Sequence, residues 1–260
     1  MSKIKKAFEN GKAFIPFITC GDPSLEVTEQ LVYAMEEAGA DLIELGIPFS
    51  DPTAEGPVIQ EASLRALEGG VTTDKIFDMA GQLSADVDVP MVFMTYANVV
   101  YSYGIDRFGK RCEQAGISGI ILPDVPFEEK GEFEETLGRY GVELVSLIAP
   151  TSAERTAMIA REAKGFIYIV SSLGVTGVRS EITTDIASIV SIIRQNTDVP
   201  CAVGFGISKP EQVAAMAAVS DGAIVGSAIV RILAKYGKEA AGPVGDYVRE
   251  MKAAVLGELG

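Results

Sequence analysis

A single carboxylate, Glu44, stands inside a short apolar run of the sequence, Leu42–Ile47. The run is rich in branched residues and bounded by Asp and Pro, which is typical of a strand buried on both faces. An ionised carboxylate is costly to bury without a partner, so the pKa of Glu44 should rise instead. No basic residue lies between Lys12 and Arg65 to pair with it locally. The pattern therefore favours a general acid/base over a salt-bridged structural residue.

The histidine count of zero narrows the chemistry that the chain can perform. Without His there is no Ser-His-Asp or Cys-His nucleophilic site, and nearly all catalytic zinc sites are excluded. No lysine falls inside an expected strand, which argues against an aldolase that forms a Schiff base on a desolvated Lys. Acid/base chemistry here must use carboxylates, Tyr, Lys or Cys.

Two glycine-rich turns follow expected strands, Val203–Pro210 and Val225–Val230. Glycine leaves backbone N–H groups open to an anion, and a helix N-terminus adds a dipole of about half a charge. Ser227 can cap such a helix and donate to a phosphate oxygen. A third turn, Gly174–Gly177, could close over the same group. Three such turns follow neighbouring strands, and no Arg or Lys lies in the strand cores. This favours a phosphate site built from uncharged backbone groups over glycines that only form tight turns.

Alternating strands and helices must position these residues. Strands are expected at Ala13–Thr19, Asp41–Ile47, Val89–Thr95, Gly119–Leu122, Glu143–Ile148, Gly165–Ser171, Cys201–Phe205 and Ala223–Val225. Helices are expected at Leu25–Ala38, Pro57–Leu67, Ile105–Ala115, Glu128–Tyr140, Ala153–Lys164, Asp185–Asn196, Lys209–Val219 and Val244–Leu256.

Eight such units without a Pro/Ser-rich linker predict one α/β domain over residues 1–260, a TIM (β/α)8 barrel. An extra N-terminal helix, Lys3–Asn10, would close the bottom of the barrel. The alternative is a doubly wound open sheet, but the first turn lacks the pattern G-x-G-x-x-G.

The active site of a TIM barrel lies at the C-terminal ends of its strands. Polar residues gather at these ends in the sequence: Asp22, Glu44, Asp51, Glu55, Tyr96, Asn98, Asp124, Ser171, Ser172 and Thr176. Asp22 and Asp51 each precede a proline and are also typical of turns. The concentration at one rim nevertheless favours a functional site.

Charge and hydropathy exclude several classes of partner. The net charge of −14 argues against nucleic acid or an anionic membrane. No apolar run approaches the roughly 18 residues of a membrane span, and no apolar segment typical of a signal peptide follows the N-terminal lysines. The three widely separated cysteines, Cys20, Cys112 and Cys201, indicate buried thiols in a reducing compartment. We therefore expect a cytoplasmic protein.

Several segments resemble, in the same order, the motifs of the tryptophan synthase alpha chain family. They are Phe14–Pro23, Leu45–Gln60, Met94–Asn98, Leu122–Pro126, Gly174–Gly177, Gly204–Ser208 and Gly226–Val230. The combination is far more specific than any single turn. The resemblance implies a TIM barrel that cleaves indole-3-glycerol phosphate to indole and glyceraldehyde 3-phosphate, without metal or organic cofactor. It also implies an αββα complex, in which indole passes to a beta subunit that carries pyridoxal phosphate.

The resemblance further implies roles for individual residues. The catalytic set would be Glu44, Glu55 and Tyr168. The indole pocket would include Phe17, Tyr96 and Phe205. The phosphate contacts and the loop that closes over them would include Thr176, Gly177, Gly206, Gly226 and Ser227. The contact with the beta subunit would lie close to Asp51 and Asp124.

Position 55 departs from the family pattern, which usually has Asp in Ala-Asp-Gly-Pro, whereas this chain has Glu55. Glu keeps the charge but adds a methylene, and misplacing a catalytic atom by about 1 Å can cost about 100-fold in rate. We favour a loop that compensates; the alternative is a catalytically weak barrel that mainly binds and activates the beta subunit. We expect the loop itself, Pro48–Gly56, to be anchored by little besides its prolines. A phosphoribosyl isomerase-like barrel is disfavoured by the motif around Glu44.

Overall fold

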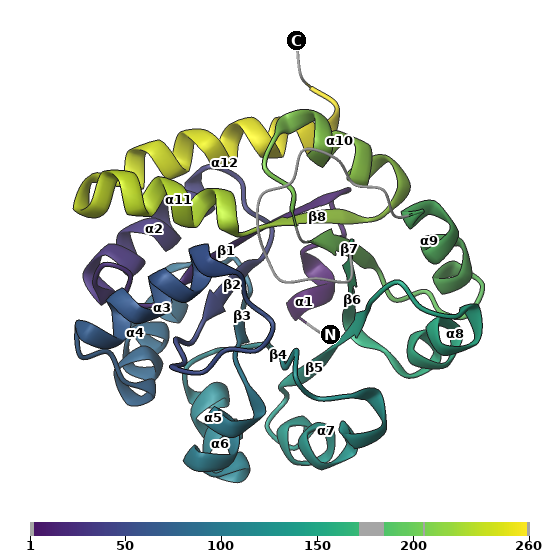
Figure 1. The fold of residues 1–260 in the computed structure, drawn as a ribbon, viewed down its shortest axis with the longest axis horizontal. Coiled ribbons are helices and arrows are strands. Elements are labelled where there is room, and N and C mark those ends of the chain that lie inside the picture. Colours follow the sequence, from purple (N-terminus) through teal and green to yellow (C-terminus); the bar gives the residue numbers. More distant parts are fainter. Residues whose placement is uncertain (1–2, 172–184, 205, 259–260) are drawn as a thin grey trace.

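The computed structural model describes residues 3–171, 185–204 and 206–258. Eight parallel strands form a closed barrel in which each strand pairs with the next and β8 pairs with β1. The strands are β1 Ala13–Thr19, β2 Ile43–Gly46, β3 Met91–Met94, β4 Gly119–Ile121, β5 Glu143–Ile148, β6 Lys164–Val170, β7 Cys201–Gly204 and β8 Gly222–Val225. Helices surround this barrel (Figure 1). The TIM barrel prediction is thereby confirmed.

The helices that cover the outside of the barrel follow the strands along the chain (Figure 1). They are α2 Leu25–Glu37, α3 Pro57–Glu68, α4 Thr73–Asp86, α5 Ala97–Tyr103, α6 Ile105–Gln114, α7 Gly131–Gly138, α8 Ala153–Glu162, α9 Ile186–Arg194, α10 Pro210–Val219, α11 Ser227–Tyr236 and α12 Ala241–Leu256. Two short 3₁₀ turns, η1 Phe127–Glu129 and η2 Gly237–Glu239, precede α7 and α12. Among the described residues, no helix is long and apolar enough to cross a membrane.

Three elements differ from those expected. Helix α5 was not expected, because its first N–H group is satisfied from a distant segment: the Asp124 carboxylate accepts from Ala97 N at 3.0 Å. Helix α4 was also not expected, although the Thr72 side chain caps it by accepting from Lys75 N. The expected helix over Glu128–Tyr140 is divided into η1 and α7.

Alternation along the strands separates two hydrophobic layers. In β1, Phe14 and Ile18 pack in the cluster between strands and helices, whereas Ile15 and Phe17 belong to the cluster inside the barrel. Helix α1, Lys3–Lys6, lies below this interior, and its Ile4 is fully buried there. A Cβ atom on Gly119 would lie 2.7 Å from the Ile4 Cδ1 atom, so glycine in β4 makes room for this plug. The α1 helix is shorter than the expected Lys3–Asn10.

Candidate active site

Glu44 projects into the barrel from β2 and is only 1% exposed. It lies opposite Phe17 of β1 and Val92 of β3 in the strand register. Neither of its carboxyl oxygens has a hydrogen-bond partner among the described residues. Burial, and then the negative charge of Glu55, raise the pKa of Glu44 to about 8. The carboxyl group therefore holds a proton at neutral pH.

Glu55 reaches the same region from the loop after β2 and is 9% exposed. Burial raises its pKa to about 7, and a hydrogen bond from the Tyr96 hydroxyl works in the opposite direction. The same hydroxyl accepts a hydrogen bond from Ala54 N at 3.1 Å. Tyr96, expected only as an indole contact, therefore also connects the loop to the end of β3.

The loop after β2 has more anchors than expected. The Phe49 ring packs against Tyr96 with 5.3 Å between ring centroids. The Gln60 side-chain amide donates to the Glu55 carbonyl oxygen at 2.7 Å. The expectation that little besides prolines anchors Pro48–Gly56 is wrong, because it did not consider Tyr96, which follows β3, or Gln60 of α3.

Two glycines make room for the aromatic residues beside the carboxylates. A Cβ atom on Gly46 would lie 2.6 Å from the Phe17 ring. A Cβ atom on Gly204 would collide with the Tyr168 hydroxyl. Tyr168 is 5% exposed, and its pKa is raised by burial and then by the charge of Glu44. Glycine at these strand ends thus lets both rings lie against the sheet next to Glu44.

A cavity of about 40 Å³ brings most of the candidate residues together, but Tyr96 is not among the residues that line it. Its lining residues are Phe17, Glu44, Glu55, Ile59, Met94, Tyr168, Gly206, Ile207, Ile224, Gly226 and Ser227. The apolar members Ile59, Met94, Ile207 and Ile224 were not predicted; for Met94 and Ile224 the inward alternation of their strands was the available signal. Thr176, Gly177 and Phe205 lie outside the described residues.

Part of the described wall of this cavity is formed by Gly206, Gly226 and Ser227, which offer backbone N–H groups. Gly226 follows β8 at the N-cap of α11, and Ser227 is the first residue of that helix. Gly206 follows β7 with a φ of 79°, which favours glycine. No Lys or Arg is among the described residues that line the cavity. An anion here would contact free N–H groups and the positive end of the α11 dipole.

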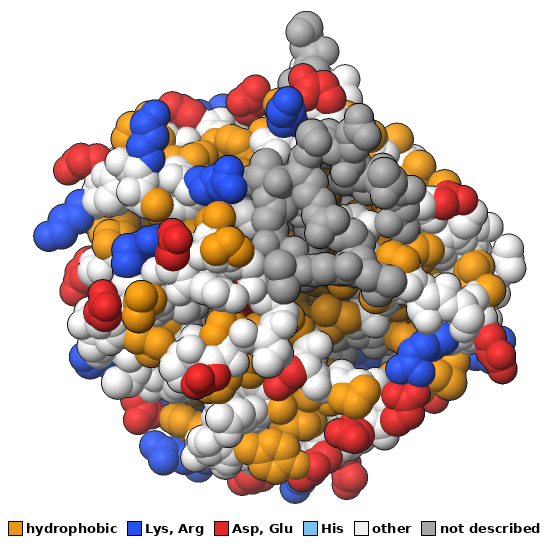
Figure 2. Space-filling view, viewed as in Figure 1, with side chains coloured by type: hydrophobic (Ala, Val, Ile, Leu, Met, Phe, Trp, Pro, Cys, Tyr) orange, Lys and Arg blue, Asp and Glu red, His pale blue; other side chains and the backbone are white. Residues whose placement is uncertain are grey.

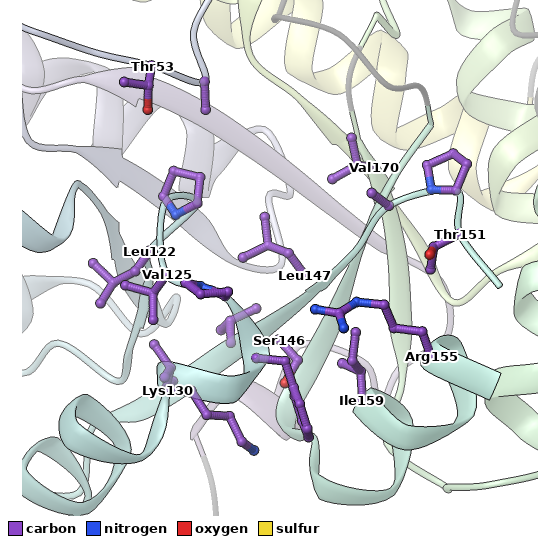
Figure 3. Close-up of a pocket in the computed structure, with 18 residues that line it drawn as sticks. Thr53, Leu122, Val125, Lys130, Ser146, Leu147, Thr151, Arg155, Ile159 and Val170 are labelled. Atoms are coloured by element: carbon purple, nitrogen blue, oxygen red, sulfur yellow. The ribbon is translucent and has the colours of Figure 1, made fainter. Parts of the chain in front are cut away.

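A larger cavity of about 620 Å³ adjoins the loop after β2. Thr53 and Ala54 line this cavity, whereas the next residue, Glu55, lines the smaller one. Figure 3 shows Leu122 and Val125 on one side of it, Arg155 and Ile159 of α8 on the other, and Leu147 between them. The loop after β2 therefore contributes to the walls of both cavities. No motif in the sequence predicted this second cavity.

The charges near the larger cavity are already paired. Arg155 makes two hydrogen bonds to the Glu128 carboxylate, at 2.6 and 3.0 Å. This pair holds the pKa of Glu128 at about 2. Lys130 forms ion pairs with Glu134 and Glu162, both at 3.1 Å. Neither cation is thus left to attract a ligand charge strongly.

The rim around the site carries the two acidic residues expected near a partner. Asp51 and Asp124 are both exposed. Figure 2 shows many charged side chains around the margin of this face. Among the described residues, no group of three or more His, Cys, Asp or Glu side chains is arranged to hold a metal ion.

Comparison with known proteins agrees with this geometry. Residues 2–255 match the family described as Tryptophan synthase alpha chain. The alpha chain from Lactiplantibacillus plantarum is 48% identical over 99% of this chain and 97% of its own length. The solved alpha subunit from Legionella pneumophila covers 99% of both chains at 34% identity, with a TM-score of 0.89. A chain of the solved tryptophan synthase complex from Pyrococcus furiosus is 34% identical, with a TM-score of 0.85, over 94% of this chain and 99% of its own. The chain belongs to the tryptophan synthase alpha chain family.

Proposed function

We propose that Glu44 and Glu55 carry out the carbon–carbon lyase reaction of this chain, the cleavage of indole-3-glycerol phosphate to indole and glyceraldehyde 3-phosphate in tryptophan biosynthesis. The observation that carries the proposal is a pair of carboxyl groups lining one cavity, with pKa values raised to about 8 and about 7. Two carboxyl groups with different environments can take different protonation states at the same pH, as an acid and a charged stabiliser require.

Glu44 acts first as an acid in this mechanism. Its proton passes to indole C3, which converts the ring to an iminium-like indolenine. The carboxylate then removes the proton from the side-chain hydroxyl next to the bond that breaks. That hydroxyl carbon becomes the aldehyde of glyceraldehyde 3-phosphate, and the electron pair of the broken carbon–carbon bond restores the indole ring. Glu44 ends the cycle protonated.

Glu55 remains ionised and stabilises the positive charge that develops at the indole N–H. Its extra methylene relative to the usual Asp is accommodated by the hydrogen bond from Tyr96 and the donation from Gln60. These contacts support compensation rather than a weak, purely partner-activating barrel.

The other cavity residues bind the two ends of the substrate. Phe17 and Tyr168 provide apolar surface beside the carboxylates, and Gly206, Gly226 and Ser227 receive the phosphate through N–H groups. The motif roles of Phe205, Thr176 and Gly177 are retained in the proposal.

The partner is a beta subunit that receives indole and carries pyridoxal phosphate, in an αββα assembly; this chain itself uses neither metal nor organic cofactor. The solved complex from Pyrococcus furiosus, which contains a chain similar to this one, supports the partnership. Asp51 and Asp124, exposed at the rim, are the residues that we place near the contact.

The test is indole release from indole-3-glycerol phosphate by the purified chain, with and without beta subunit. Glu44→Gln should remove nearly all turnover, because it deletes the transferable proton and keeps the shape. Glu143→Gln, at the start of β5 and so at the opposite end of the barrel, is the matched control and should retain activity. Turnover above a few percent in Glu44→Gln would reject the assignment.

A further inference from the structure

Helix α3 begins immediately after Glu55, so its first turn sets the course of the loop. Gly56 is the N-cap and Pro57 is the first helical residue. Proline at this position has a fixed φ that suits the start of a helix. The backbone on the C-terminal side of Glu55 is therefore directed by α3.

Gln60 of α3 contacts the backbone of Glu55 directly. Its side-chain Nε2 donates to the Glu55 carbonyl oxygen at 2.7 Å, while its own backbone N–H donates to Gly56 O at 3.1 Å. Gln60 is otherwise exposed to solvent. Holding an exposed, flexible side chain in one conformation costs entropy, so this hydrogen bond must offset that cost.

The segment on the other side of Glu55 is held as well. Ala54 N donates to the Tyr96 hydroxyl at 3.1 Å, and Tyr96 also donates to the Glu55 carboxylate. Glu55 is thus fixed through the chain before it, the chain after it, and its own carboxylate.

The helix that carries Gln60, α3, is itself held against the barrel by a second interaction. Arg65 donates two hydrogen bonds of 2.8 Å to the Asp22 carboxylate, which lies in the loop after β1 and is only 1% exposed. Bidentate pairs of this kind fix geometry more strongly than single contacts. Gln60 therefore acts from a helix whose position is itself fixed.

We propose that Gln60 is a positioning residue for Glu55, acting through the donated hydrogen bond to the Glu55 carbonyl oxygen. The inference rests on the proposed catalytic role of Glu55. A glutamate has one more side-chain torsion than an aspartate, so the placement of its carboxylate depends more on a fixed backbone. Without the Gln60 contact, the carbonyl and the carboxylate of Glu55 can move away from Tyr96.

The experiment compares Gln60→Met with Glu61→Gln in the full chain, by measuring kcat and KM for indole release between pH 6 and 9. Methionine keeps the length and helix propensity of Gln but cannot donate, and Glu61 is the adjacent exposed residue of α3. Loss of one hydrogen bond predicts a fall in kcat of roughly 5–10-fold in Gln60→Met with little change in KM. Glu61→Gln should match the parent.

A second readout separates positioning from a merely structural role. Because the Tyr96 hydrogen bond lowers the pKa of Glu55, its weakening should move the rising limb of the pH–rate profile to higher pH in Gln60→Met. An unchanged kcat, or a lower kcat with an unmoved limb, would overturn the proposal. Glu55→Gln is measured beside it: if this variant keeps the parent rate and limb, the catalytic role of Glu55 is wrong whatever Gln60 does.

Discussion

Glu44 and Glu55 line one cavity, and the negative charge of Glu55 contributes, after burial, to the raised pKa of Glu44. The two groups are held in different ways. Glu44 comes from a barrel strand and has no hydrogen-bond partner among the described residues, whereas Glu55 comes from a loop and receives a hydrogen bond from Tyr96. This asymmetry keeps the proton on Glu44 and the charge on Glu55, which is the division of roles that the cleavage needs.

The pH dependence of kcat/KM should be bell-shaped, with limbs near pH 7 and pH 8. Activity rises as Glu55 loses its proton and falls as Glu44 loses the proton that it must donate. Because the two groups interact, the limbs belong to the pair. Glu55→Gln should lower kcat/KM and abolish the rising limb. It should also move the falling limb to lower pH, because the negative charge of Glu55 that raises the pKa of Glu44 is then absent. Rate measurements from pH 5.5 to 9.5 check this, and a falling limb that stays in place would contradict it.

The buried carboxyl group of Glu44 should destabilise the fold at neutral pH. Its folded pKa of about 8 lies above the ordinary value of 4.5, so its stability contribution is complete below pH 4.5 and is lost as the pH rises to 8. Glu44→Gln does not titrate and should be more stable at pH 7 by about 1–3 kcal/mol, or roughly 2–10 °C in Tm. Thermal unfolding of both proteins at pH 4.5, 7 and 8 checks this. A stability difference that does not grow with pH would contradict the burial argument.

The barrel was predictable because its signals are local. Eight apolar runs separated by amphipathic segments gave every strand to within a few residues, since a strand buried on both faces is apolar throughout. Helix α5 was missed for the opposite reason, because its cap comes from Asp124, which lies 27 residues away along the chain. Tertiary contacts of this kind leave no local pattern.

The site was predictable in its chemistry but not in its connections. Glu44 could be identified because a lone carboxylate in an apolar run has few explanations. The role of Tyr96 in holding Ala54 and Glu55 could not, since the two segments meet only when β2 and β3 pair. Gln60 was part of a recognised motif, yet only the structure shows its side chain directed back at the Glu55 carbonyl oxygen.

The phosphate site should be sensitive to charge at Gly226. A side chain there would already be close to Phe17, because a Cβ atom would lie 3.1 Å from its ring. Gly226→Asn and Gly226→Asp impose the same bulk, so only the charge differs between them. Repulsion between an Asp carboxylate and the phosphate should weaken binding of glycerol 3-phosphate by a further factor of roughly 10 or more. Calorimetric titration of the parent and both variants measures this, and equal affinities for Asn and Asp would place the phosphate elsewhere.

The beta subunit should raise the cleavage rate by holding the loop after β2. This loop is connected to the barrel by Tyr96 and to α3 by Gln60, but its tip carries Asp51 exposed at the rim. A partner packed on this tip would restrict the remaining motion and thereby the position of the Glu55 carboxylate. A coupling free energy of roughly 1–3 kcal/mol between beta-subunit binding and cleavage corresponds to a rate increase of about 5–150-fold.

Because the side chain of Glu55 is longer than that of Asp, the parent should depend on the beta subunit for its cleavage rate at least as strongly as the Glu55→Asp variant. Indole formation is measured for the parent and for Glu55→Asp, each alone and with saturating beta subunit. The stimulation should be equal or larger in the parent, because its carboxylate has one more torsion to restrict. If the partner changes neither rate, the position of this loop does not limit catalysis; if it stimulates Glu55→Asp more than the parent, the contacts of Tyr96 and Gln60 already hold Glu55 in place.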